Sequence, residues 1–399
     1  MRRGLALAAL AVLALLALLP AGCGGKFELP TEKPDAFIPT DKSYIVLATW
    51  YGLEGVQDIQ LPAGMRQLYV LFNYGGTGGP AVPRGKVLMY PLTKNEPVAA
   101  SYFPPPVGLF NPVALAVGTN PLQLFVLDQG DSCQAKYDVR RNSCAPDEDT
   151  THATGHPFRS QIYDYAATWR VREYSSLGGD TVSTFTDTTV AQPFGIAADN
   201  QGRVYVAALA VVLDTSQTDQ RIRTRKFVSR VYRYKRGLRY PDVLDINMPG
   251  TTSWHRDTSW VVFDGSGASS VADPRGLYWS SFGSNPLFIA DRGNNQAKGV
   301  SSSEIGVSVV RVDGQATGAA FLHPESVAAD LAGYFYVVDR DNRRVLRYAY
   351  SGEYIQRVDV LPNDIGLPLL DPISVAVDDS LAYVADRGLG QIIRYQRQP

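Results

Sequence analysis

The stretch that decides the fold is PISVAVD at Pro372–Asp378, followed by LAYVADRG at Leu381–Gly388 and QIIRYQ at Gln391–Gln396. Each run is short, rich in Val, Ile, Leu and Tyr, and bounded by Gly, Asp or Pro, which is typical of β-strands. A near copy of the first run, PESVAAD, begins earlier in the chain at Pro324. The chain therefore contains an internal repeat built from short strands.

This repeat extends through most of the chain. Earlier copies begin at Pro112 (PVALAVG), Pro193 (PFGIAAD) and Pro274 (PRGLYWS), and a weaker copy without the proline begins at Val56. The last two proline-to-proline steps are about 50 residues long, with room for four short strands each, and the first two are longer by about 30 residues. No long apolar pattern with a helical period follows residue 22. The sequence thus predicts an all-β chain of six similar units.

The consensus P-x-x-V-A-x-D, then Y-V-x-D-R, then a basic and aromatic strand resembles the NHL repeat of β-propellers. The resemblance covers residues 44–399 and implies a six-bladed propeller. The last copy supplies only three strands, and an additional strand, SYIVLAT at Ser43–Thr49, lies before the first copy. We expect this strand to pair beside Gln391–Tyr395, complete the last blade and close the ring, because closure removes free sheet edges.

Residues 1–22 are typical of an export signal. A basic start precedes an unbroken apolar run, Leu5–Leu19, which is shorter than the roughly 20 residues that span a bilayer. The small residues that follow, and then Cys23, resemble the lipobox of bacterial lipoproteins, although Pro20 departs from that pattern. The resemblance implies that Cys23 carries the lipid and begins the mature chain. An ordinary cleaved signal and an uncleaved anchor are the alternatives.

These features predict the organisation of the chain. We expect residues 1–22 to be a signal peptide, residues 23–42 a lipid-anchored linker, and residues 43–399 the propeller. The three prolines and scattered charges of the linker suit a semi-extended tether. The protein is then expected in the cell envelope, outside the cytoplasm and attached to a membrane. The sequence leaves open which membrane this is and how many copies assemble.

Charge and cysteine content narrow the range of functions. The chain has 38 Lys+Arg and 39 Asp+Glu, a balance that argues against a surface built for nucleic acid. Four His and three Cys leave little material for a metal site rich in either residue. With Cys23 acylated, Cys133 and Cys144 remain in an oxidising compartment, where a disulfide is expected and two free thiols are the alternative.

An aspartate recurs at the end of the second strand of several repeats. Because it recurs, we interpret it as an acceptor of backbone N–H groups in a turn; a ring of cation ligands is the alternative. An arginine follows it in the last three repeats and is expected to pack over the neighbouring blade, with ligand binding as the alternative. The residues concerned are Asp128, Asp291, Asp339, Asp386, Arg292, Arg340 and Arg387.

The residue after each repeat proline should lie near one mouth of the central channel. These positions hold Gln57, Val113, Phe194, Arg275, Glu325 and Ile373. Arg275 and Glu325 are candidate binding residues, with a salt bridge or a solvated rim as the alternative. The set lacks a second carboxylate and a base at a fixed distance, so it predicts no catalytic residue.

Two insertions are expected, in blade 2 (about 130–175) and in blade 3 (about 212–265). The segment Arg221–Arg239 holds nine Lys/Arg and no acid, which suits an anionic partner, although a solvated outer strand has the same composition. Its candidate binding residues are Arg221, Arg223, Arg225 and Lys226, with Trp254 nearby. Trp254 has a second interpretation, as a filler between blades. Long loops on a rigid scaffold are where binding sites concentrate, so we expect the interaction surface on blades 2 and 3.

The sequence favours a binding or scaffolding propeller that engages a protein or polysaccharide partner, with no cofactor. The main alternative is a hydrolase, lactonase or lyase that uses calcium or zinc in the channel, and a purely structural component of the cell envelope is a further one. Leu53-Glu54-Gly55 faintly resembles the Glu-Gly opening of calcium-dependent six-bladed hydrolases, and His323 is the one histidine at a repeat position. The fold alone does not choose between these functions, because one fold hosts many activities.

Overall fold

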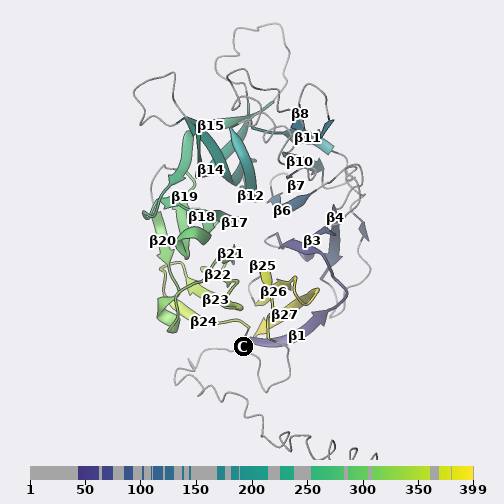
Figure 1. The fold of residues 1–399 in the computed structure, drawn as a ribbon. Coiled ribbons are helices and arrows are strands. Elements are labelled where there is room, and N and C mark those ends of the chain that lie inside the picture. Colours follow the sequence, from purple (N-terminus) through teal and green to yellow (C-terminus); the bar gives the residue numbers. More distant parts are fainter. Residues whose placement is uncertain are drawn as a thin grey trace, which may run out of the picture. The chain divides into compact units, whose positions relative to one another are not determined.

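A computed structural model describes residues 44–62, 65–74, 85–92, 101–102, 109, 111–119, 122–129, 137–138, 143–144, 169–175, 181–187, 189–213, 225–237, 253–282, 286–303, 308–359, 368–378 and 380–398. The chain divides into two units, Met1–Asp41 and Lys42–Pro399, and all the described residues lie in the second. They form an all-β, six-bladed propeller (Figure 1), as the repeat predicts.

The first three blades are built as follows, from the inner strand outwards. Blade 1 contains β2 (Val56–Gln60), β3 (Gln67–Asn73), β4 (Gly85–Pro91) and β5 (Ser101–Tyr102). Blade 2 contains β6 (Pro112–Thr119), β7 (Leu122–Asp128), β10 (Arg170–Ser175) and β11 (Thr181–Phe185). Blade 3 contains β12 (Val190–Ala198), β13 (Val204–Leu213), β14 (Arg225–Gly237), β15 (Ser253–Asp264) and the short β16 (Ser270–Val271).

The other three blades follow the same plan. Blade 4 contains β17 (Pro274–Trp279), β18 (Pro286–Asp291), β19 (Gln296–Ser301) and β20 (Ser308–Val312). Blade 5 contains β21 (Pro324–Ala329), β22 (Tyr334–Asp339), β23 (Arg344–Ala349) and β24 (Tyr354–Arg357). Blade 6 contains β25 (Pro372–Asp378), β26 (Leu381–Asp386), β27 (Gln391–Arg397) and β1 (Tyr44–Trp50). Among the described residues, single-turn 3-10 helices at Arg292–Asn294 and Gln315–Thr317 and a hairpin of β8 (Tyr137–Asp138) with β9 (Ser143–Cys144) lie outside these sheets.

The N-terminal strand closes the ring. β1 pairs antiparallel with β27, from Tyr44 opposite Arg397 to Trp50 opposite Ile392. The Trp50 ring packs against Tyr90 of blade 1, with ring centroids 5.5 Å apart, and the Tyr44 hydroxyl lies 3.0 Å from the Tyr336 hydroxyl of blade 5. Inner strands of neighbouring blades contact one another, including β25 with β2. The prediction that the first strand completes the last blade is therefore confirmed.

The recurring aspartates hold turns together. Their carboxylates are fully buried, and each accepts a backbone N–H from the turn before its blade's inner strand. The donor–acceptor distances are 2.8 Å from Asn111 to Asp128, 2.7 Å from Ala272 to Asp291, 2.7 Å from Leu322 to Asp339 and 2.6 Å from Leu370 to Asp386. These bonds confirm the structural interpretation of the repeated acids.

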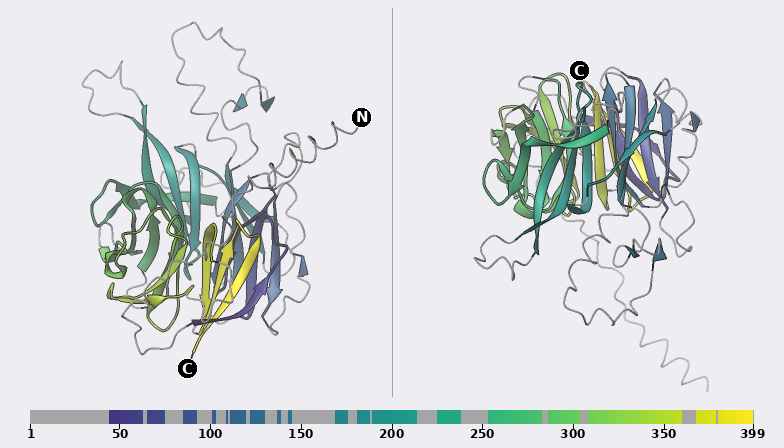
Figure 2. Two further views of the ribbon diagram at one scale, coloured as in Figure 1. Left: turned by 60° about the horizontal axis from the view of Figure 1, so that its bottom comes forward. Right: turned by 90° about the horizontal axis from the view of Figure 1, so that it is seen from above.

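Blade 3 is taller than its neighbours. Its strands β13 and β14 have 10 and 13 residues, and Figure 2 shows this hairpin, in teal, extending beyond the adjacent blades. Much of the stretch predicted as the blade 3 insertion thus forms the strands β14 and β15. Cys23, Cys133, Arg221 and Arg223 lie outside the described residues, as do the side chains of Cys144 and Arg225. Within the described part of the chain, no helix has the length and apolar character needed to cross a bilayer.

Candidate functional site

The residues after the repeat prolines meet in one cavity. In each inner strand the register shifts directly after the repeat proline, or after Val56 in blade 1, as between Val56 and Asp58 or Pro372 and Ser374. Such a bulge re-aims a side chain, and here it turns the extra residue towards the channel mouth. A cavity of about 110 Å³, which we name the ionic cavity, is lined by all six predicted residues: Gln57, Val113, Phe194, Arg275, Glu325 and Ile373.

The two candidate binding residues at this mouth, Arg275 and Glu325, form ion pairs with other residues. Arg275 lies 2.9 Å from Asp273, and Glu325 lies 3.7 Å from Arg292 and 3.5 Å from Arg340. Arg275 and Glu325 therefore pair with other residues and not with each other. These ion pairs belong to a network of alternating charges across blades 4, 5 and 6, which consists of Arg275, Asp273, Arg292, Glu325, Arg340, Asp371 and Arg387.

Trp254, the aromatic candidate, packs between blades 2 and 3. Its ring stacks on Phe185 at 4.9 Å, and the Arg236 guanidinium lies 5.2 Å above it. Its indole N–H donates to Ser183 Oγ at 2.8 Å, close to the fully buried carboxylate of Glu173. These contacts match the interpretation of Trp254 as a filler between blades. Lys226, the neighbouring basic candidate, is exposed.

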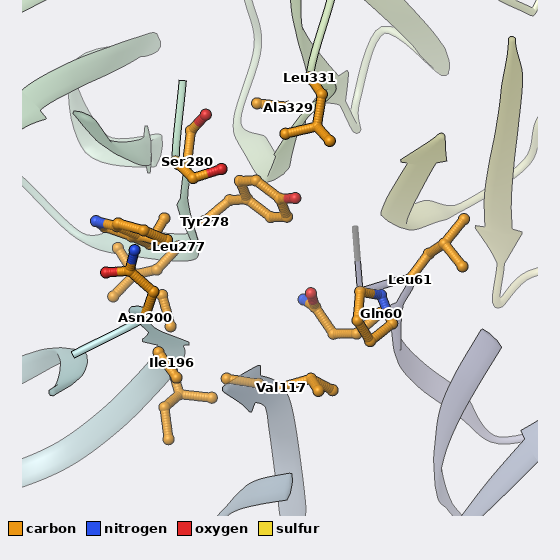
Figure 3. A pocket seen from close by; sticks show the side chains of 16 residues that line it. Gln60, Leu61, Val117, Ile196, Asn200, Leu277, Tyr278, Ser280, Ala329 and Leu331 are labelled. Carbon is orange, nitrogen blue, oxygen red and sulfur yellow. The ribbon is translucent and has the colours of Figure 1, made fainter. Parts of the chain in front are cut away.

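A second cavity lies along the same channel and differs in chemistry. Its volume is about 270 Å³, and we name it the neutral cavity (Figure 3). Gln60, Ile196 and Leu277 line both cavities, so the two adjoin. The described residues that line the neutral cavity have uncharged side chains, among them Gln60, Val117, Asn200, Tyr278, Trp279 and Leu331.

Two polar residues break the repeat inside the neutral cavity. Four residues after the repeat proline, four blades carry alanine, at Ala116, Ala197, Ala328 and Ala376. Blades 1 and 4, which are opposite each other in ring order, carry Gln60 and Tyr278 instead. Figure 3 shows the Gln60 amide and the Tyr278 hydroxyl directed towards the centre of the cavity. Because a structural residue of a repeat recurs from blade to blade, these two departures make the neutral cavity the candidate site.

Gln60 and Tyr278 have polar groups to offer a ligand. Neither side chain forms a hydrogen bond with any residue that the structure describes, and the exposed amide of Asn200 is equally unengaged. Burial, together with the nearby Asp330 and Asp378 carboxylates, raises the pKa of Tyr278 to about 12. The Tyr278 hydroxyl therefore keeps its proton at neutral pH and can donate a hydrogen bond. Sequence analysis missed both residues, although comparing the copies position by position would have found them.

Asp58 also breaks the repeat, at a position two residues before Gln60. Two residues after the proline, the other blades carry Ala114, Gly195, Gly276, Ser326 and Ser374. Small residues are needed there because the inner strands approach closely: a Cβ on Gly195 would lie 1.9 Å from the Arg275 carbonyl oxygen. Asp58 lines the ionic cavity, and its carboxylate accepts bonds from Leu115 N–H at 2.9 Å and Ser374 Oγ at 2.7 Å.

The protonation of Asp58 is shifted by its surroundings. Burial raises the pKa of the Asp58 carboxyl to about 6, and hydrogen bonds from Leu115, Ser374 and Ile59 offset only part of that effect. Asp58 forms no ion pair with any described residue. At neutral pH the channel therefore holds a mostly ionised carboxylate whose charge has no counterion from the described chain.

The hydrolase alternative requires a metal, for which clustered His, Cys, Asp and Glu side chains are common ligands. No three His, Cys, Asp or Glu residues in that part of the chain lie close enough to share an ion. The described side chains thus contain no cluster of these four residue types, and a metal-dependent reaction stays a prediction.

Comparison with known proteins identifies neither a family nor an activity for this chain. No family model matches the chain, and no curated protein matches it. Similar solved structures include the PQQ-bound aldose sugar dehydrogenase from Streptomyces coelicolor (12% identity, 90% of this chain and 99% of that chain, TM-score 0.49). They also include a gluconolactonase from Xanthomonas campestris (10% identity, 90% of each chain, TM-score 0.47). A Bacteroides thetaiotaomicron protein of unknown function is similar at 11% identity (89% of this chain, 76% of that chain, TM-score 0.49). At this level of similarity, none of them carries an argument about what this chain binds.

Proposed function

We propose that this protein is a binding propeller that holds a hydroxyl-bearing ligand, such as the end of a polysaccharide, in the neutral cavity. The observation that carries the proposal is the replacement of the repeat alanine by Gln60 and Tyr278 on opposite sides of the channel. Both side chains lack hydrogen-bond partners among the described residues and point into the same cavity (Figure 3). Convergent free polar groups in a largely apolar pocket are typical of a small-molecule site.

The lining suits a sugar better than an ion. Amide groups such as those of Gln60 and Asn200 donate and accept at once, as a hydroxyl-rich ligand requires. Trp279 and Tyr278 supply aromatic surface for the apolar face of a sugar ring. The volume of about 270 Å³ lies just below the roughly 300–1,000 Å³ of drug-sized sites, which favours one sugar unit over a long chain segment.

Restoring the repeat tests this proposal. The double variant Gln60→Ala and Tyr278→Ala introduces the residue that four blades already carry, so the fold is expected to persist. We expect wild-type protein to bind glucose or N-acetylglucosamine, as measured by calorimetry or by quenching of Trp279 fluorescence, and the variant to bind at least tenfold more weakly. Val113→Ala, at the ionic cavity, is the control. Equal affinity of the variant and the wild type would place the ligand elsewhere, and a protein partner on blades 2 and 3 would become the better proposal.

The membrane anchor is a separate part of the proposal and rests on the export signal and Cys23. With Cys23 lipid-modified, the propeller would lie at a membrane surface outside the cytoplasm and meet its ligand there. We expect Cys23→Ser to move the protein from the membrane fraction to the soluble fraction of its native host without changing its melting temperature. Retention of the variant in the membrane fraction would indicate an uncleaved anchor.

A further inference from the structure

Asp58 carries a negative charge that its structural role does not require. At the same repeat position in blades 5 and 6, Ser326 Oγ accepts the Val375 N–H at 3.4 Å and Ser374 Oγ accepts the Ile59 N–H at 3.2 Å. Asp58 Oδ2 accepts the Leu115 N–H in the same way, and so links blade 1 to blade 2. A serine therefore suffices for the bond between blades, and the negative charge of Asp58 needs another explanation.

The carboxylate also keeps an acceptor site open. Oδ1 accepts bonds from Ile59 N–H at 2.8 Å and from Ser374 Oγ, whereas Oδ2 has the Leu115 N–H as its partner among the described residues. All three donors are neutral, and Asp58 lies on the wall of the ionic cavity. The other carboxylate on that wall, Glu325, is already paired with two arginines. Asp58 is thus the acid on this wall that lacks a counterion from the described chain.

Asp58 is also placed within reach of the neutral cavity. It lies two residues before Gln60 on β2, which is about 7 Å along an extended strand and on the same face. Gln60, Ile196 and Leu277 line both cavities. A group carried by a ligand in the neutral cavity can therefore extend past Gln60 towards the free Oδ2 position of Asp58.

We infer that the ligand of the neutral cavity carries a protonated primary amine that pairs with Asp58, as an amino sugar does. The inference rests on the proposed function, since it assigns a ligand class to the same site. The hydroxyl groups of the ligand would engage Gln60, Tyr278 and Asn200. Its ammonium would donate to Asp58 Oδ2 and neutralise a charge that is costly to leave alone in the channel.

The test compares three hexoses that differ at one substituent. Glucosamine, N-acetylglucosamine and glucose are titrated into the full-length protein by calorimetry at pH 7.0, where such an amine is mostly protonated. We expect glucosamine to bind at least tenfold more tightly than the two neutral sugars. Asp58→Ser, which uses the residue found in blades 5 and 6, is expected to remove this preference and to leave the affinity for glucose within about twofold.

Each other outcome overturns a specific part of the inference. Equal binding of all three sugars by the wild type would leave the proposed function standing and refute the amine. Loss of the preference in Glu325→Gln, with Asp58→Ser unchanged, would assign the amine to the rim and not to Asp58. If none of the three sugars binds while circular dichroism shows a folded protein, the proposed function and the inference are both wrong.

Discussion

Deletion of residues 43–50 is expected to prevent folding or to lower the melting temperature by more than about 10 °C. The deletion removes β1, which is the outer strand of blade 6, and exposes the edge of β27. It also removes the buried rings of Tyr44 and Trp50, each of which stabilises the fold by about 1.5–3 kcal/mol or more through burial alone. Differential scanning calorimetry of the purified protein measures the effect.

The large effect follows from what β1 connects. Trp50 packs on blade 1 and Tyr44 hydrogen-bonds to blade 5, so this one strand ties blade 6 to both of its neighbours. A deletion of residues 24–41 is the matched control, because it removes a longer stretch and leaves β1 in place. If the two deletions shift the melting temperature equally, closure by β1 contributes little to stability and the ring is held by the contacts of its inner strands.

The fold could be predicted from the sequence because its signals recur. The copies share the proline, the alternating strand and the turn aspartate, so several weak signals support one another. Because the last copy lacks its outer strand, β27 could be predicted as the partner of β1. The bulged position after the proline could be predicted for the same reason. The ion-pair partners of Arg275 and Glu325 could not be predicted, because they depend on how far long side chains reach across neighbouring blades.

The candidate site was harder to predict because it consists of exceptions to the repeat. Searching for a consensus treats Gln60, Tyr278 and Asp58 as noise in poorly matching copies, although each replaces a small residue at a channel position. Trp254 shows the opposite error: an aromatic residue in a basic stretch suggests a binding surface, but its stacking on Phe185 depends on a contact between blades that no local pattern reveals.

Asp58 is expected to make the protein less stable as the pH rises from about 4 to about 6. Its pKa in the folded protein, about 6, lies above that of an exposed aspartate, so the folded state holds the proton more tightly than the unfolded state. Below about pH 4 the Asp58 carboxyl is protonated in both the folded and the unfolded state, so its raised pKa does not lower the free energy of unfolding. Between the two values the unfolded state loses its proton first, and the free energy of unfolding therefore falls, by up to about 3 kcal/mol in total.

The variant Asp58→Ser isolates this effect from the other titrating groups. Urea denaturation of both proteins at intervals from pH 4 to pH 7.5 gives the difference in their free energies of unfolding at each pH. We expect the wild type to lose stability relative to the variant across this range, with most of the loss between about pH 4 and pH 6. Curves that stay parallel would mean that Asp58 has an ordinary pKa. The loss matters for function, because a carboxylate that destabilises the empty propeller at neutral pH is stabilised when a cationic ligand neutralises it.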